Sequence, residues 1–267
     1  FKKIINTILK NDQLIWVSII FLIQQIGLNL ILGGLGSTYI YFAFGYEGGL
    51  YSLFSTIGVL ATAFLMVFYP AISKAIKRKK LMAYMLVMSL VFYVILLLSG
   101  IFMPNSTLKF WVITVSYMFT NLGQYAYYLI MMISIINTVE YNEYKNGNRD
   151  EAIIASLRPF LTKLSSAIVV MLTSLSYIIF GITDVTNKIS SFEQQTNLGT
   201  IKEAEKLSSI KDVLAGITSF QTLGLLCVMC ILPAILMTLS YTLYKNHYKL
   251  DEDEYNRIVK ELERRKK

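Results

Sequence analysis

The chain has 267 residues, of which 55% are hydrophobic and 16% are charged, and its mean hydropathy is +0.53. This apolar content exceeds what a soluble core needs and indicates a membrane protein. The formal net charge of +8 gathers at the ends of apolar stretches, where basic side chains meet anionic lipid, so the charge does not indicate a nucleic-acid partner.

Six stretches of the sequence are almost free of charge and long enough to cross a bilayer as helices, which takes about 20 residues. We predict membrane spans at 13–43, 48–73, 81–103, 110–138, 152–183 and 213–244. Lysine and arginine crowd the connection 74–80 and the tail, whereas the first and third connections hold only Glu47 and Lys109. We therefore predict a multi-pass protein of the cell's inner (plasma) membrane. The positive-inside pattern predicts that both of its termini face the cytoplasm.

The first predicted span carries amides and glycines on one face. Gln25, Asn29, Gly33 and Gly36 follow one another at helical spacing, so their side chains point the same way. The face either lines a polar cavity or lets another helix approach closely, and the sequence leaves both interpretations open.

Polar and aromatic side chains also recur along one face of the fourth predicted span. The members of this stripe are Thr114, Tyr117, Asn121, Gln124 and Tyr128. Aromatic rings stack on the C–H face of a sugar, and amides bond to its hydroxyls. We therefore predict that Asn121, Gln124 and Tyr128 contact a sugar; the alternative is a packing face between helices.

The connection 139–151 is predicted to be a charged cytoplasmic loop, with Glu140, Glu143 and Arg149 around the turn at 146–148. The next span is unusual because it contains two cations, Arg158 and Lys163. Charges at membrane depth usually face a bundle interior or a water-filled path.

Lys163 is the deeper of these two cations. If the fifth span begins near Glu151, Lys163 lies about 18 Å along the helix, close to the bilayer centre. An unpaired charge there costs about 2.5–3.5 kcal/mol, yet no predicted span contains an aspartate or glutamate. We therefore expect a second set of helices to supply the carboxylate partner.

Two polar segments complete the chain. The segment 184–212 is predicted to be an extracellular loop, with a short amphipathic helix at 201–214. The segment 245–267 is predicted to be a cytoplasmic helix, because Asp251 and Glu254 have the spacing of a helix cap.

Residues typical of catalytic and metal sites are scarce. His247 is the only histidine and lies beyond the last predicted span, and the two cysteines, Cys227 and Cys230, are too few for a metal site. The sequence also lacks a glycine-rich phosphate loop and a repeat typical of a channel filter. We therefore predict no enzyme activity and no cofactor; of the remaining classes, a carrier or a scaffold is favoured over a channel.

The run 137–149, with Lys163 fourteen residues after Arg149, resembles the cytoplasmic loop and eleventh helix of the glycoside–pentoside–hexuronide:cation symporters, the melibiose permease family. The resemblance extends to the KNDQL segment at 10–14 and to the tail after Leu250. It implies an all-α membrane protein with six transmembrane helices, the C-terminal half of a major facilitator superfamily fold. The expected partner is the N-terminal six-helix half of the same transporter.

The resemblance also implies roles for single residues. Glu140, Glu143 and Arg149 match a cytoplasmic gate formed with the first half, although Asn137 stands where the family typically has an acid. Lys163 matches a lysine beside the cation-site carboxylates of the first half. Tyr128 falls where the family has an aromatic residue in contact with sugar. Arg158 and Thr162 lie about one turn from Lys163 and are expected to face the same cavity and to bind substrate.

These observations predict secondary active transport of a sugar or glycoside, coupled to a cation, Na⁺ or H⁺, by alternating access. The coupling cation and membrane lipid are further expected partners. Two alternatives remain at this point: a lysophospholipid carrier of the same fold, and a half-size membrane scaffold that transports nothing.

Overall fold

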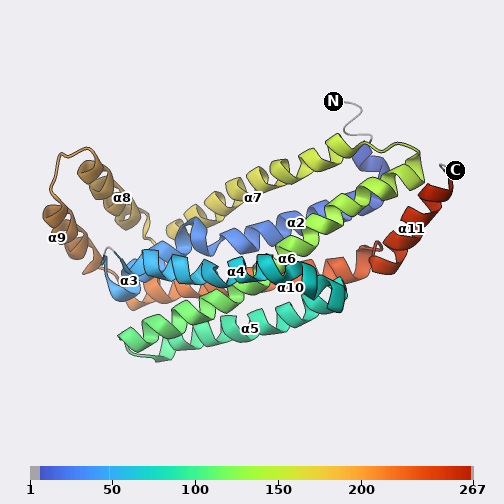
Figure 1. Cartoon of the computed structure of the whole chain (residues 1–267). Coiled ribbons are helices and arrows are strands. Elements are labelled where there is room, and N and C mark those ends of the chain that lie inside the picture. Colours follow the sequence, from blue (N-terminus) through green and yellow to red (C-terminus); the bar gives the residue numbers. More distant parts are fainter. Residues whose placement is uncertain (1–6, 48, 266–267) are drawn as a thin grey trace.

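The computed structural model describes residues 7–47 and 49–265, and in these ranges it contains helices and no strands. Six helical segments are long and apolar enough to cross a membrane, and Figure 1 shows them running alongside one another. They are α2 (Asp12–Asn29) with its continuation η1 (Ile31–Leu35) and α3 (Gly36–Phe44), α4 (Leu50–Ala75), α5 (Arg78–Phe102), α6 (Thr107–Asn146), α7 (Glu151–Ile179) and α10 (Ser219–His247). The predicted all-α fold with six candidate spans is confirmed.

Short polar helices lie at the two ends of the bundle. The hairpin of α8 (Thr183–Asn197) and α9 (Glu203–Leu214) lies at one end, and α11 (Glu252–Arg265) at the other (Figure 1). Two sequence expectations need correction here. The segment 184–212 forms two helices rather than a loop with one, and 139–146 continues α6 instead of belonging to a loop. The end of α6 stays helical because it packs against the start of α2 and against α11, which supply partners that a free loop would lack.

Short capping motifs fix where several helices begin and end. The Asn11 side chain accepts a hydrogen bond from the Leu14 N–H at 3.0 Å and starts α2, and Ser106 caps α6 through the Lys109 N–H at 3.2 Å. Gly147, with φ of 74°, ends α6 because glycine adopts the left-handed conformation without a steric penalty. Gly147 therefore places the turn at 146–148 where the sequence predicts it.

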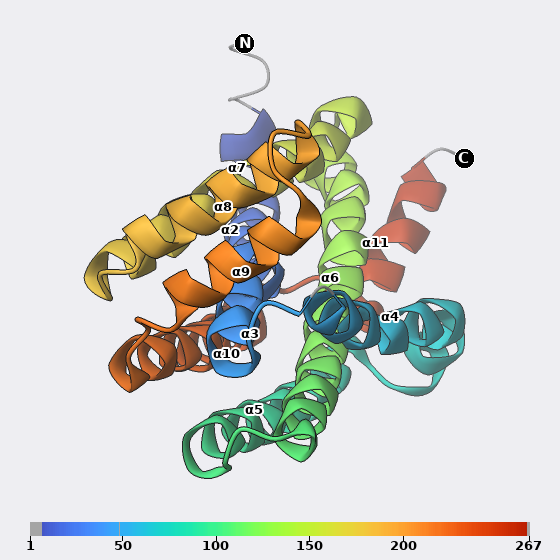
Figure 2. The same ribbon diagram turned by 90° about the vertical axis from the view of Figure 1, so that its left-hand side faces the viewer.

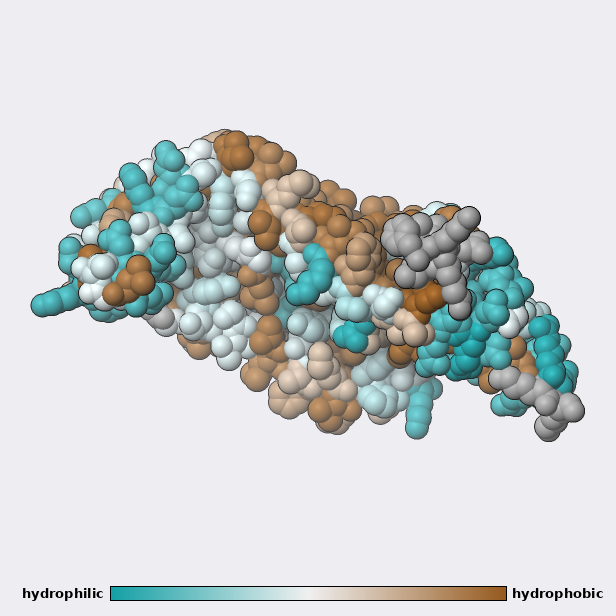
Figure 3. All heavy atoms as spheres, turned by 90° about the horizontal axis from the view of Figure 1, so that it is seen from above, coloured by the Kyte–Doolittle hydropathy of each residue, from teal (hydrophilic) through white to brown (hydrophobic). Residues whose placement is uncertain are grey.

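The helices differ in how much of their surface is covered. In Figure 2, α2 and α6 lie between α7 on one side and α4 on the other, and both central helices are largely buried. By contrast, α4 and α7 expose bulky apolar side chains such as Phe64, Val67, Phe160 and Met171. The face in Figure 3 is brown over much of its middle and teal at both ends, which fits a hydrocarbon layer between two polar boundaries.

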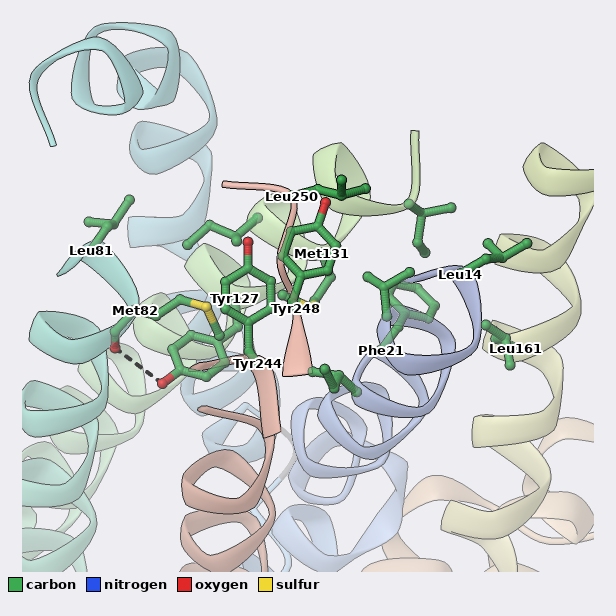
Figure 4. Close-up of a cluster of buried hydrophobic side chains, with 14 of the residues drawn as sticks. Leu14, Phe21, Leu81, Met82, Tyr127, Met131, Leu161, Tyr244, Tyr248 and Leu250 are labelled. Carbon is green, nitrogen blue, oxygen red and sulfur yellow. Dashed lines mark hydrogen bonds between the residues drawn. The ribbon is translucent and has the colours of Figure 1, made fainter. Parts of the chain in front are cut away.

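Tyrosines tie the tail to the bundle at the α11 end (Figure 4). The Tyr127 hydroxyl donates to the Met82 carbonyl at 3.1 Å, and the Tyr248 hydroxyl donates to the Ser134 carbonyl at 3.0 Å. The Tyr244 and Tyr248 rings are stacked with centroids 4.7 Å apart. Buried tyrosines combine apolar packing with a satisfied hydroxyl, so this cluster joins α5, α6 and α10 to the segment before α11.

The structure distinguishes between the two interpretations of the glycine-rich face of the first span, a polar cavity and close helix packing. A Cβ on Gly33 would lie 2.5 Å from Val169 of α7, so the glycine lets α7 approach closely. Gly34 has φ of 130° within the π-helical turn η1, and its carbonyl accepts the Tyr177 hydroxyl at 3.1 Å. The glycines therefore serve helix packing rather than a polar cavity.

Candidate functional site

The three residues predicted to form the gate meet at the α11 end of the bundle. The Arg149 guanidinium donates to Glu140 at 2.9 Å and to Glu143 at 3.1 Å, and it also reaches Glu151 at 3.3 Å. Its hydrogen bonds to Glu151 and Glu143, together with the charge of Glu140, raise the pKa of Arg149 above its ordinary value. The cation is therefore shared among three carboxylates of this same chain.

A network of asparagines, not anticipated from the sequence, holds this turn in place. The Asn142 amide donates to the Asn148 carbonyl at 2.7 Å, and Asn146 donates to Asn142 at 2.9 Å. Asn11 reaches across from the start of α2 to the Thr138 carbonyl at 3.0 Å. The amides in the runs KNDQL and NTVEYNEYKNGNR were the available signal, because asparagine side chains commonly bond to turn backbones.

An ion pair between a buried arginine and a half-buried glutamate lies near the gate residues, and it too was not anticipated from the sequence. Arg78, whose side chain is 7% exposed, bonds through Nε to Glu252 at 3.0 Å and through Nη2 to the Leu250 carbonyl at 3.1 Å. With the Asn137 amide oriented to suit its neighbours, its oxygen accepts from Arg78 Nη1 at 2.9 Å. Asn137, which stands where the family typically has an acid, thus contacts Arg78, while the tail supplies the carboxylate.

This pair predicts a pH-dependent attachment of α11. Burial alone would raise the pKa of Glu252, but the backbone N–H groups of Arg78 and Glu252 and the Arg78 charge lower it below the ordinary 4.5. The stabilisation is therefore full above 4.5 and is lost as the pH falls through the lowered folded-state pKa. The protection of α11 amides from hydrogen exchange, measured relative to the intrinsic exchange rate at each pH, should fall below that pH.

The control for this prediction is the neighbouring exposed pair. Glu252→Gln should loosen α11 near neutral pH and remove this pH dependence, whereas Asp253→Asn, which breaks the exposed pair with Lys77, should change little. Slow α11 exchange in Glu252→Gln that matches the unaltered protein would contradict the role given to this pair.

Tyr128 and Arg158 form a contact between α6 and α7. The Arg158 Nη2 donates to the Tyr128 hydroxyl, and its guanidinium carbon lies 5.8 Å from the centre of the Tyr128 ring. The Tyr125 ring lies edge-on to Tyr128, with centroids 6.1 Å apart. Arg158 is exposed and Tyr128 is half-buried, so an aromatic ring and a cation lie together at the surface of the bundle.

Lys163 and Thr162 follow on α7. Lys163 is exposed, and its ammonium has no hydrogen bond or ion pair with any residue that the structure describes. The Thr162 hydroxyl donates to the Arg158 carbonyl at 3.0 Å, which leaves its oxygen free to accept. The structure thus brings Tyr128, Arg158, Thr162 and Lys163 to neighbouring surfaces of α6 and α7.

The prediction that Asn121 and Gln124 contact a sugar does not fit the structure, because both residues are only 2% exposed. Asn121 donates to the Gly58 carbonyl of α4 at 2.9 Å, and Gln124 donates to the Tyr93 hydroxyl of α5 at 3.4 Å. Their stripe on α6 turns into the bundle, where α4 and α5 cover it. The packing interpretation therefore fits this part of the stripe, and of the three predicted sugar contacts on α6 only Tyr128 is partly exposed.

Residues 2–252 match the family described as MFS/sugar transport protein, where MFS is the major facilitator superfamily. The chain belongs to this family. This match confirms the membership predicted from the segment 137–149 and makes the chain part of a multi-pass membrane transporter fold, in a family of transporters rather than enzymes.

Curated relatives agree with this assignment. The chain is 26% identical to a raffinose carrier protein of Pediococcus pentosaceus over 98% of this chain and 35% of the relative. It is 26% identical to a lactose permease of Lactobacillus delbrueckii subsp. bulgaricus over 98% of this chain and 36% of that protein. An uncharacterized symporter of Bacillus subtilis is 27% identical over 100% of this chain and 50% of the symporter. The chain thus spans between about a third and half the length of these relatives.

Proposed function

We propose that the chain is the second six-helix half of a sugar carrier in the cell membrane, driven by Na⁺ or H⁺ and working by alternating access, with both termini in the cytoplasm. The observation that carries the proposal is the contact between Tyr128 of α6 and Arg158 of α7, because α7 also exposes Lys163, whose ammonium pairs with no residue that the structure describes. The names of the raffinose and lactose relatives support a sugar as the substrate. Carriers built from two halves bind their substrate between them near the midplane.

Each residue of this surface would make a different contact with the sugar. The half-buried Tyr128 ring offers a flat face for the C–H side of a pyranose, and Arg158 offers several N–H donors for its hydroxyls. Thr162 adds a hydroxyl within one turn of Arg158. Asn121 and Gln124 are not included, because they are buried against α4 and α5.

Lys163 would couple the cation to the sugar. A lysine ammonium at membrane depth is costly unless a carboxylate pairs with it, and the first half would supply that carboxylate. A coupling cation that binds to the same carboxylate changes the charge facing Lys163. The sugar and the cation would thereby influence each other through one ion pair.

The gate would use Arg149 with Glu140 and Glu143. The second carboxylate oxygen of Glu140 is buried and accepts no hydrogen bond from a described residue. A buried acceptor without a donor is costly, so a movement that uncovers this oxygen to a basic or amide group of the first half would be favoured. Such a contact would close the cytoplasmic path, and its loss would open it.

The proposed sugar site is tested by equilibrium binding of lactose to the purified complete carrier. Arg158→Ala removes charge-assisted hydrogen bonds, which contribute about 1.5–3 kcal/mol each, so binding should weaken about 10- to 100-fold. Tyr128→Ala should weaken binding as well, and Tyr128→Phe less, because the ring remains. Ser156→Ala, an exposed change on the same helix, is the matched control. Unchanged binding in Arg158→Ala would exclude this surface as the sugar site.

A further inference from the structure

A second candidate binding site lies at the α8–α9 end of the bundle, opposite α11. It is a pocket of about 280 Å³ between α3, α4, α7 and α8, and three tyrosines, Tyr41, Tyr51 and Tyr177, contribute to its lining. Ser190 and Glu193 of α8 also line it. The proposed midplane site uses none of these residues.

The tyrosine hydroxyls of the pocket lining differ in whether they are hydrogen-bonded to other described residues. The Tyr177 hydroxyl is held by the Thr38 hydroxyl at 2.7 Å and by the Gly34 carbonyl at 3.1 Å. The rings of Tyr41 and Tyr51 meet edge to face with centroids 6.1 Å apart. Among the residues that the structure describes, no hydrogen-bond partner exists for the hydroxyls of Tyr41 and Tyr51. Both are therefore available to a ligand.

Glu193 gives the pocket a positioned acceptor. The Tyr46 hydroxyl donates to one carboxylate oxygen of Glu193 at 2.8 Å, and this bond ties α8 to the end of the first span. The second oxygen accepts no hydrogen bond within residues 7–47 and 49–265. Among the described residues that line the pocket there is no lysine or arginine, so an anionic ligand would face Glu193 with no cation in the lining.

The composition of the lining selects a class of ligand. Tyrosine rings and hydroxyl groups suit the C–H face and the hydroxyls of a sugar, and a carboxylate oxygen accepts from sugar hydroxyls. A quaternary ammonium ion would use the rings and the carboxylate but none of the four serine and threonine hydroxyls that line the pocket. The volume of about 280 Å³ lies just below the usual range of about 300–1,000 Å³ for drug-sized ligands, which fits one monosaccharide unit.

We propose that this pocket is an outer subsite, which binds one neutral monosaccharide unit of the sugar before the sugar reaches the Tyr128 surface. The inference rests on the proposed function, because it takes the α8–α9 end as the outer end and a sugar as the cargo. It adds a place where the carrier selects its substrate before the membrane is crossed.

The test is protection of an introduced thiol by sugar. In the complete carrier, with Cys227 and Cys230 replaced by alanine, Ser190→Cys is labelled on intact cells with a membrane-impermeant maleimide. Lactose outside the cell should slow this labelling several-fold, and choline should not. Ser208→Cys, exposed on α9 and outside the pocket lining, should react at the same rate with and without lactose. Equal labelling of Ser190→Cys with and without lactose would overturn the proposal.

Further variants separate the pocket from the midplane site. Tyr41→Ala and Glu193→Gln should abolish the protection, and Tyr41→Phe should weaken it, because only the ring remains. Arg158→Ala, which disables the midplane site, should keep the protection. Loss of protection in Arg158→Ala would mean that a closing movement shields Ser190, which would also overturn the proposal.

Transport kinetics distinguish failure of this inference from failure of the proposed function. In a carrier that takes up sugar, Tyr41→Ala should raise the external KM several-fold with little change in the maximal rate or in efflux. An unchanged KM would overturn the subsite and leave the transport proposal intact. A carrier that moves no sugar under a Na⁺ or H⁺ gradient would refute the transport proposal, while the labelling experiment would still decide whether the pocket binds sugar.

Discussion

Replacing Lys163 by alanine is expected to abolish the accumulation of sugar against its gradient while the protein still inserts into the membrane. Lys163 is exposed on α7 and pairs with none of the residues that the structure describes, so its replacement breaks no hydrogen bond or ion pair among them. It also removes a charge that costs about 2.5–3.5 kcal/mol at the bilayer centre. The variant should therefore lose a function rather than stability.

Uptake into proteoliposomes under an imposed Na⁺ or H⁺ gradient measures this effect. In Lys163→Ala, internal lactose should rise to the external concentration and no further, and exchange of lactose across the membrane should continue. Lys163→Arg keeps the charge and should retain part of the accumulation. Lys260→Ala, an exposed change on α11, is the control. Full accumulation by Lys163→Ala would remove Lys163 from the coupling mechanism.

Replacing Gly58 by valine is expected to disrupt the packing of α4 on α6. A Cβ at Gly58 would lie 2.1 Å from Cε1 and 2.3 Å from Cδ1 of the Tyr117 ring, which itself is stacked on Phe54 with centroids 4.6 Å apart. Because the ring is buried, it has little room to move. Overpacking of this kind costs about 1–3 kcal/mol, and the hydrogen bond from Asn121 to the Gly58 carbonyl would be strained as well.

Thermal unfolding in detergent micelles tests this prediction. Gly58→Val should unfold at a lower temperature, and adding Tyr117→Ala should restore part of the loss, because it removes the atoms that clash. Gly49→Ala, at a glycine whose Cβ would meet nothing within 4 Å, should leave the unfolding temperature unchanged. Equal stability of Gly58→Val and the unaltered protein would show that α4 can shift away from α6 at little cost.

Two glycines of the first span show what a local sequence pattern can and cannot predict. The spacing of Gly33 and Gly36 with Gln25 and Asn29 predicted a shared face but left its role open. The approach of Val169 to within 2.5 Å of a Cβ at Gly33 decided in favour of packing. The role of this face depends on α7, which lies more than 100 residues later in the chain. A local sequence pattern therefore cannot reveal it.

Local composition is enough to predict the six apolar segments, the charges at their ends and the two cations inside α7. These features depend on local composition, because a helix in lipid satisfies its backbone internally and needs only enough consecutive apolar residues. The family was also accessible from the sequence, through the run 137–149 and Lys163.

Which polar residues are exposed depends on how the helices pack against one another. Asn121 and Tyr128 share a stripe on α6, yet α4 crosses at Gly58 and buries the first, while the second stays partly open beside Arg158. The pair of Arg78 and Glu252 joins residues 174 positions apart. Periodicity gives the direction of a side chain from its own helix, but burial and ion pairing depend on which other helix lies opposite, and that is set only when the whole bundle packs.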